Sequence, residues 1–183
     1  MKTLTISYIS KIIFSKNIAK LLLFLTTIVC FVPVNAQTLT KTARYKGMEI
    51  KLPEAWTFET QEVERGVMYQ MVCMGKNNTG DANTIALAKA DMEIDLEGFL
   101  NVMKGAFQVA IPGNPFFSQN RIGTFRNYRT LYCTFSGNIG SYRYSGQIMV
   151  FHDKGRTFLI LHQGDARYYE SGLNDRIFAT FKL

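Results

Sequence analysis

Two short runs of this chain carry an apolar side chain at every position. They are residues 148–151 and 158–161, and the turn sequence Asp153-Lys154-Gly155 lies between them. Successive side chains of a β-strand point to opposite faces of the sheet. A strand that is apolar on both sides therefore needs cover on both faces. The two runs predict a hairpin of central strands with a packed layer above and below it.

The rest of the chain supplies further strands and the material for those layers. Asp95–Ala110 is the clearest helix, because apolar residues recur at steps of three and four and Asp95 is placed to cap its N-terminus. A closing helix is expected from about Asp165 to Phe181. Strands are expected at 48–52, 56–62, 67–74, 84–90, 121–125, 129–136, 142–152 and 156–162. This order, without a βαβ rhythm, predicts an α+β domain whose mostly antiparallel β-sheet is covered by helices.

The first 36 residues have the organisation of a cleavable signal peptide. Four lysines and no acidic residue lie in the first twenty positions, and an apolar run, Leu21–Val34, follows. That run is about fourteen residues long, whereas a membrane-spanning helix needs about twenty. Val34-Asn35-Ala36 places cleavage before Gln37. A retained anchor and a lipidated Cys30 are the weaker alternatives.

The part that remains is expected to be one exported domain, periplasmic or secreted from a double-membraned bacterium, with no transmembrane helix after processing. Residues 37–46 are polar and predict a flexible lead-in, and 47–183 predict a single globular domain. Without the four signal lysines the formal charge falls from +7 to about +3. A charge of that size gives no reason to expect nucleic acid as a partner.

The beginning and the end of this domain resemble the PsbP/Mog1-like superfamily. Met48-Glu49-Ile50-Lys51-Leu52-Pro53-Glu54-Ala55-Trp56 is similar to the opening strand, Pro and Trp of that superfamily, and the phrase 177–182, Ile-Phe-Ala-Thr-Phe-Lys, is similar to its closing helix. The resemblance implies an α/β/α sandwich without an inherited active site. Its members are assembly factors, adaptors and exported proteins of unassigned role, so no catalytic residue is carried over.

The residues that carry reactive side chains are few. Cys73 and Cys133 have only each other to pair with in the exported domain, and either a disulfide or two buried free thiols fits their places on predicted strands. If Asp153-Lys154-Gly155 closes a tight hairpin, His152 and His162 are roughly 16 Å apart. We therefore expect neither a shared metal ion nor a proton relay between the histidines, no catalytic residue, and no cofactor.

Two surfaces are candidates for binding. Basic and aromatic side chains gather on the late strands, where a solvated strand face is the simpler interpretation and a partner-binding face the functional one; the residues are Arg126, Tyr128, Arg129, Tyr142 and Tyr144. Alternatively a pocket lies between the sheet and the helix at Asp95–Ala110, with a lining of Tyr69, Phe99, Tyr132 and Phe158.

The function that the sequence favours is therefore a non-enzymatic exported domain that binds a protein partner of the cell envelope or assists an assembly there. A small-molecule site or an enzyme with a pocket beneath the helix is the alternative. The specific partner or ligand, the oligomeric state, and the choice between periplasm and extracellular space are left open by the sequence.

Overall fold

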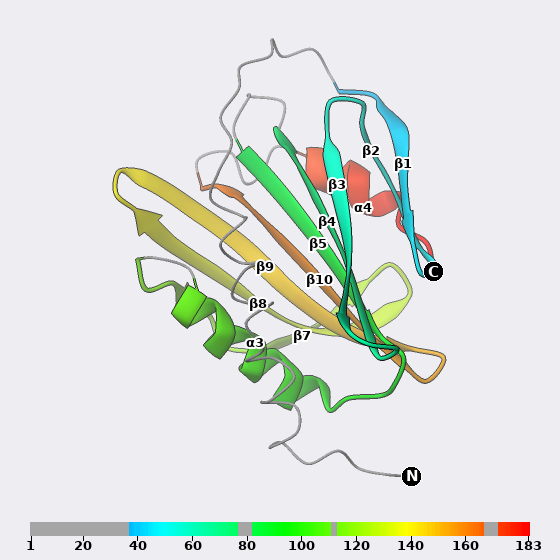
Figure 1. The fold of residues 1–183 in the computed structure, drawn as a ribbon. Coiled ribbons are helices and arrows are strands. Elements are labelled where there is room, and N and C mark those ends of the chain that lie inside the picture. The colour runs from blue at the N-terminus through cyan, green and yellow to red at the C-terminus, as the bar shows by residue number, and fades with distance from the viewer. Residues whose placement is uncertain (1–36, 77–81, 111–112, 167–171) are drawn as a thin grey trace.

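The computed structural model describes residues 37–183 except for 77–81, 111–112 and 167–171, so the predicted signal peptide lies outside the described residues. Ten strands and two helices are described (Figure 1). In chain order they are β1 (Leu39–Tyr45), β2 (Met48–Pro53), β3 (Thr57–Glu64), β4 (Met68–Lys76), β5 (Ala82–Ala90), α3 (Leu96–Ala110), β6 (Phe116–Phe117), β7 (Arg121–Phe125), β8 (Tyr128–Ile139), β9 (Tyr142–Asp153), β10 (Arg156–Asp165) and α4 (Leu173–Ala179).

Eight of the strands form one large antiparallel sheet, in the order β3-β4-β5-β10-β9-β8-β6, with β7 also paired to β8. The predicted hairpin of central strands is confirmed, since β9 pairs with β10 and Phe151 lies opposite Phe158. The turn between them has left-handed backbone at Lys154 and Gly155, with φ of 49° and 77°, which suits a two-residue hairpin loop. The mostly antiparallel α+β fold that the sequence predicted is therefore observed.

Helix α3 covers one face of the large sheet. Its apolar side packs on alternate residues of the central strands; this cluster includes Phe99, Leu100, Phe107, Val72, Ala86, Ile148, Val150, Leu159 and Leu161. The carboxylate of Asp95 accepts a hydrogen bond of 2.8 Å from the backbone N–H of Gly98, as expected of an N-cap. The predicted helix and its cap are confirmed.

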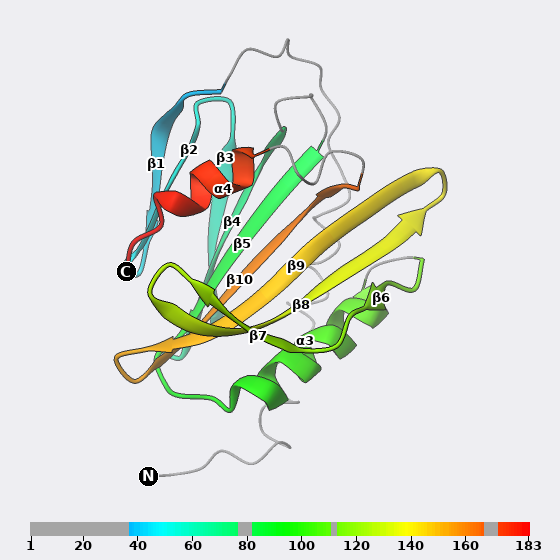
Figure 2. The same cartoon turned by 180° about the vertical axis from the view of Figure 1, so that it is seen from behind.

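The opposite face is covered by the β1–β2 hairpin and α4 (Figure 2). The intervening residues of the same strands point here; this second cluster includes Ile50, Leu52, Leu173, Ile177, Phe181, Met71, Ile85, Ile160, Phe151 and Phe158. No backbone pairing joins β1–β2 to the large sheet. Residues beyond α4 hold the hairpin instead, because Glu49 and Lys182 exchange two backbone hydrogen bonds of 2.9 Å.

The predicted flexible lead-in at 37–46 is wrong for most of its length. Residues 39–45 form β1, which pairs with β2 across a turn with left-handed backbone at Lys46 and Gly47. Only Ala43 of this strand is fully buried, and the other side chains reach solvent or the edge of the core. A strand that buries so little shows no apolar period, which is why the sequence pattern did not reveal it.

The closing helix also begins later than predicted. β10 continues to Asp165, which pairs with Tyr144, and α4 starts only at Leu173. Gly172 before it has a φ of 69°, a left-handed conformation that cannot belong to a right-handed helix. Part of the expected helix, 167–171, lies outside the described residues.

The opening phrase that carried the family resemblance has a packing role. Its Trp56 is buried at 1% exposure, and the indole N–H donates a 3.0 Å hydrogen bond to the carbonyl of Lys76. The ring lies flat against Gly75, where an added Cβ would come within 2.3 Å of it. Trp56 therefore packs the β2–β3 connection against the end of β4 and hydrogen bonds it there.

Candidate functional site

The two cysteines lie on opposite faces of the large sheet. Cys73 belongs to the cluster beneath α4 and Cys133 to the cluster beneath α3, and both are free. Their strands, β4 and β8, have β5, β10 and β9 between them, which places the two strands about 19 Å apart. A disulfide needs Cα atoms within about 7 Å. The disulfide alternative is therefore wrong, and the buried free thiols remain.

Both thiols are expected to be unreactive in the folded protein. Burial raises the pKa of Cys73 to about 12 and also raises the pKa of Cys133, so almost no thiolate is present at neutral pH. In protein beginning at Gln37, a maleimide should add to neither cysteine without denaturant and to both in guanidinium chloride, with intact mass as the measurement. Incomplete labelling of unreduced, denatured protein would contradict free thiols.

The predicted partner face is not one surface. Tyr128 stacks on Phe151 with ring centroids 4.7 Å apart, and Arg126 donates a 3.1 Å hydrogen bond to the carbonyl of Ala179 at the end of α4. Tyr144 is only 3% exposed and lies in the α3 cluster. The grouping fails because these residues, close in sequence, alternate between faces and lie at both ends of the long β8–β9 hairpin.

Two other members of the predicted face, Arg129 and Tyr142, are also exposed, and they lie far from each other. Arg129 is exposed near the start of β8, whereas Tyr142 lies at the other end of the hairpin, opposite Ile139. Ten residues of β8 separate Arg129 from Ile139, which is roughly 33 Å of strand. One partner footprint centred on these five residues is therefore excluded.

The predicted pocket lining is divided by the sheet as well. Phe99 lies in the cluster of α3, whereas Phe158 lies in the cluster of α4 and Tyr132 packs against that second cluster. Tyr69 is 7% exposed and belongs to neither cluster, and the ammonium of Lys46 lies 4.6 Å from its ring centroid. These four side chains fill the two cores or their margins and do not enclose a common cavity.

The histidines have separate structural roles, and they lie in the predicted register, with His162 opposite Gln147. The Nε2 atom of His152 is 2.8 Å from the carbonyl oxygen of Ile94. His162 is 5% exposed and hydrogen bonds with the side chain of Asn174, which accepts a 2.6 Å bond from the amide of Asn83. Among the described residues no group of three or more metal-ligating side chains gathers.

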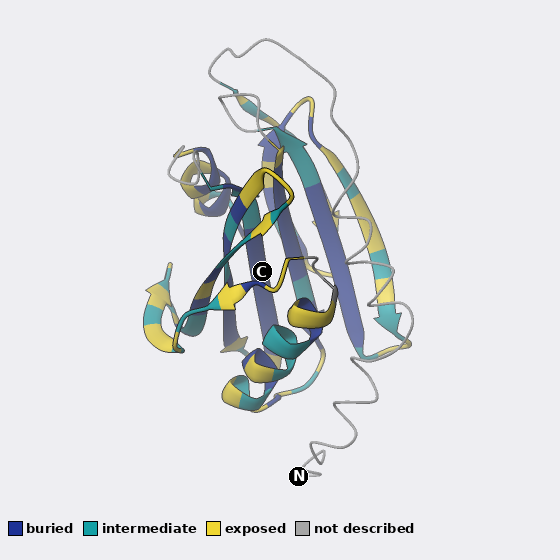
Figure 3. Ribbon diagram, turned by 90° about the vertical axis from the view of Figure 1, so that its left-hand side faces the viewer, coloured by how far each residue is buried: buried dark blue, intermediate teal, exposed yellow. Residues whose placement is uncertain are grey.

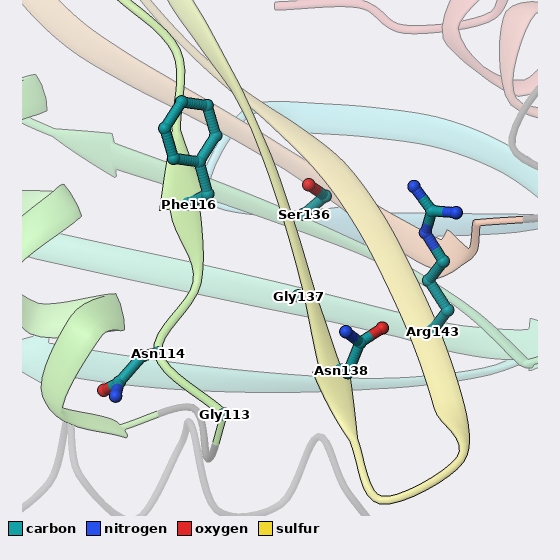
Figure 4. A pocket seen from close by; sticks show the side chains of 7 residues that line it. All are labelled: Gly113, Asn114, Phe116, Ser136, Gly137, Asn138 and Arg143. Atoms are coloured by element: carbon teal, nitrogen blue, oxygen red, sulfur yellow. The ribbon is translucent and has the colours of Figure 1, made fainter.

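A surface hollow of about 340 Å³ lies at the far end of the large sheet, between the start of β6 and the β8–β9 turn (Figure 4). Sequence analysis did not find it. The described residues that line it include one cation and no acid: Gly113, Asn114, Phe116, Ser136, Gly137, Asn138 and Arg143. Figure 3 shows exposed residues along the β8–β9 turn beside it.

Strand pairing places four of these side chains on one face. Phe116 pairs with Ser136, and Arg143 pairs with Asn138, and directly opposed residues point to the same side of a sheet. Their neighbour Phe135 belongs to the α3 cluster, so these four point to the other face. We call Phe116, Ser136, Asn138 and Arg143 the β6 edge surface.

The β6 edge surface has an apolar part and a charged part. Phe116 is 74% exposed, so most of its ring is in contact with solvent. The side chain of Arg143 forms neither an ion pair nor a hydrogen bond within the described part of the chain. In Figure 4 the two residues stand on either side of β8, with Ser136 and Asn138 between them.

Known proteins confirm the class of fold. No family model and no curated protein matches this sequence. The solution structure of cyanobacterial PsbP (CyanoP) from Synechocystis is similar to this chain with a TM-score of 0.52 at 8% identity, over 84% of this chain and 98% of that one. The chain is thus an α+β domain with an antiparallel sheet, and its fold is PsbP-like, as the opening and closing phrases predicted.

Two further solved structures are similar with lower scores. A crystal structure from Bacteroides thetaiotaomicron has a TM-score of 0.48 at 7% identity and covers 79% of this chain and 48% of that one. LpqN, involved in cell envelope biogenesis of Mycobacterium tuberculosis, has a TM-score of 0.45 at 15% identity, with 78% and 90% covered. Neither described helix of our chain is long and apolar enough to cross a membrane.

The surface could not be found from sequence for a physical reason. Phe116 lies in a strand of two residues, too short for any periodicity, and it joins Arg143 only through the pairing of both strands with β8. The one available signal was the sequence Pro115-Phe116-Phe117, four residues after the end of α3, where two adjacent aromatic residues cannot both face the same side of a strand.

Proposed function

We propose that this protein is an exported, non-enzymatic binding domain that holds a protein partner in the bacterial cell envelope through the β6 edge surface. The observation that carries the proposal is the exposed ring of Phe116 beside the guanidinium of Arg143, which has no side-chain partner among the described residues. Aromatic residues and arginine are the side chains most enriched among those that dominate protein interfaces.

The surroundings of this surface support the same function. Pairing with β8 and β9 fixes the backbone of its residues, so little backbone freedom would be lost when a partner binds. Helix α4 and the β1–β2 hairpin cover the same face over the opposite half of the sheet, and no described helix or strand covers this end (Figure 2). The export part of the proposal rests on the lysines and the apolar run of residues 1–36.

Site-directed photocrosslinking in the native cell tests the proposal. A photoreactive benzoylphenylalanine at position 116 is expected to give a discrete crosslinked product, and Arg143→Glu in the same chain should reduce it. The matched control carries the probe at Val109, which is 81% exposed on α3. The recovered protein should begin at Gln37 by intact mass and fractionate with the envelope.

Two results would refute this proposal. One is the absence of any product at position 116, and the other is the same product at positions 116 and 109, since a probe on α3 lies on the other side of the sheet. Recovery of protein with residues 1–36 attached would overturn the export part alone. The alternative of a pocket beneath α3 has no comparable support, because its lining residues are separated by the sheet.

A further inference from the structure

We propose that the occupant of the β6 edge surface is an extended acidic segment of the partner, which places a carboxylate at Arg143 and a large apolar side chain on Phe116. This inference rests on the proposed function and adds the chemistry of the partner. It follows from the charge of the hollow, its supply of hydrogen-bond donors, and the spacing of its two parts.

The charge of the hollow favours an anion. Arg143 is the one charged residue among the described residues that line it, and its guanidinium has no acidic partner in that part of the chain. A guanidinium presents paired N–H donors that match the two oxygens of a carboxylate. A basic ligand would bring a second positive charge to a hollow that has no acid to receive it.

The neighbouring polar groups fit a carboxylate as well. Ser136 and Asn138 lie on the same face as Arg143, and Asn138 is directly opposite it. A hydroxyl and a side-chain amide can both donate hydrogen bonds. A carboxylate that approaches Arg143 therefore meets further hydrogen-bond donors. No acidic group is added by the other described lining residues, which are Gly113, Asn114, Phe116 and Gly137.

The apolar part sets the spacing of the ligand. Phe116 and Arg143 lie on β6 and β9, two strand positions apart, and their partners on β8, Ser136 and Asn138, are two residues apart. With about 4.8 Å between strands and 3.3 Å per residue, their backbones are roughly 12 Å apart. In an extended ligand this distance corresponds to side chains about three to four positions apart.

A chain segment fits this geometry better than a compact small molecule. The contact groups are spread over three strands at the end of the sheet, as Figure 4 shows. An extended segment reaches both groups at once, and its side chains alternate in direction, so residues two or four apart meet the same surface.

A peptide selection tests the inference. A phage library of random linear dodecapeptides is selected on the protein from Gln37 onward and then sequenced. We expect enrichment of Asp or Glu three or four positions from a large apolar residue. Binding of the enriched peptides should weaken about tenfold with Arg143→Glu, because an exposed ion pair is replaced by repulsion. Phe116→Ala should weaken it as well.

The matched control is Arg129→Glu, which makes the same charge change on β8 far from the hollow. If Arg129→Glu weakens peptide binding as much as Arg143→Glu does, the loss of binding comes from the change in net charge alone, and the inference is overturned. Enrichment of basic or uncharged sequences, or no enrichment at all, would overturn it as well. Circular dichroism and thermal unfolding of each variant establish that it is folded.

The two proposals fail in different experiments. A specific crosslink at position 116 together with selected peptides that lack acidic residues would retain the partner-binding surface and overturn the acidic segment. Acidic peptides that bind through Arg143 without any crosslink at 116 in the native cell would support the chemistry of the hollow and overturn its use for a protein partner there.

Discussion

Replacing Phe151 with alanine is expected to lower the free energy of unfolding by about 3–5 kcal/mol, the range for deletion of a buried phenylalanine. The ring is fully buried on β9. It stacks between Tyr128, at 4.7 Å between centroids, and Phe158, at 5.4 Å. Its loss would leave a cavity where the central strands meet the edge strands, and the fixed backbone of β9 limits how far neighbours can fill it.

Urea denaturation followed by circular dichroism measures this effect. The matched control is Phe116→Ala, which deletes the same side chain from a site that is 74% exposed, and it should change stability by less than about 0.5 kcal/mol. Equal losses for the two variants would contradict the burial pattern. Because Phe116 belongs to the β6 edge surface, the control also separates binding from stability.

Acid is expected to destabilise the protein through His162, by about 3 kcal/mol between pH 7 and pH 4. Burial lowers the pKa of His162 to about 4, from an ordinary value of 6.5. Below pH 6.5 His162 binds a proton in the unfolded chain but stays neutral in the folded chain. The free energy of unfolding therefore falls as the pH drops towards 4. Above pH 6.5 both states hold the neutral ring, and this contribution vanishes.

The expected comparison is urea denaturation of wild type and His162→Gln between pH 7 and pH 4. Both proteins have the same carboxylates, so the difference between their free energies of unfolding at each pH excludes the carboxylate contribution. His152→Gln is the control, since His152 is exposed, and it should keep the wild-type pH dependence. Parallel pH curves for wild type and His162→Gln would contradict this assignment, as would an NMR titration in which folded His162 protonates near pH 6.5.

Much of the fold could be predicted because each face of a strand leaves its own pattern. The alternation of Met48, Ile50 and Leu52 and the unbroken apolar runs at 148–151 and 158–161 reflect one covered face and two covered faces respectively. β1 and β6 were missed for the opposite reason. One buries a single side chain completely and the other is two residues long, so neither gives a periodic signal.

The candidate sites failed where they depended on pairing between distant strands. The sequence placed Cys73 and Cys133 each on a strand. The strand order β4-β5-β10-β9-β8, which the sequence does not reveal, keeps those strands apart. The pairing register between them then decides that the two thiols point to opposite faces of the sheet. The same limit applies to Phe99 and Phe158. Local periodicity predicts that a residue is buried but does not identify the layer in which it is buried.

The attachment of the β1–β2 hairpin has a consequence for the order of folding. The hairpin is held by the segment around residue 180, since Thr180 accepts a hydrogen bond from the backbone of Lys51, 129 positions away in sequence, and Glu49 pairs with Lys182. Such contacts are among the most distant that a chain of this size can make, and distant contacts slow folding. A chain that emerges N-terminus first from a ribosome or a translocation pore presents β1 and β2 long before residues 173–182 can cover them. This layer therefore closes only after residue 182 has emerged.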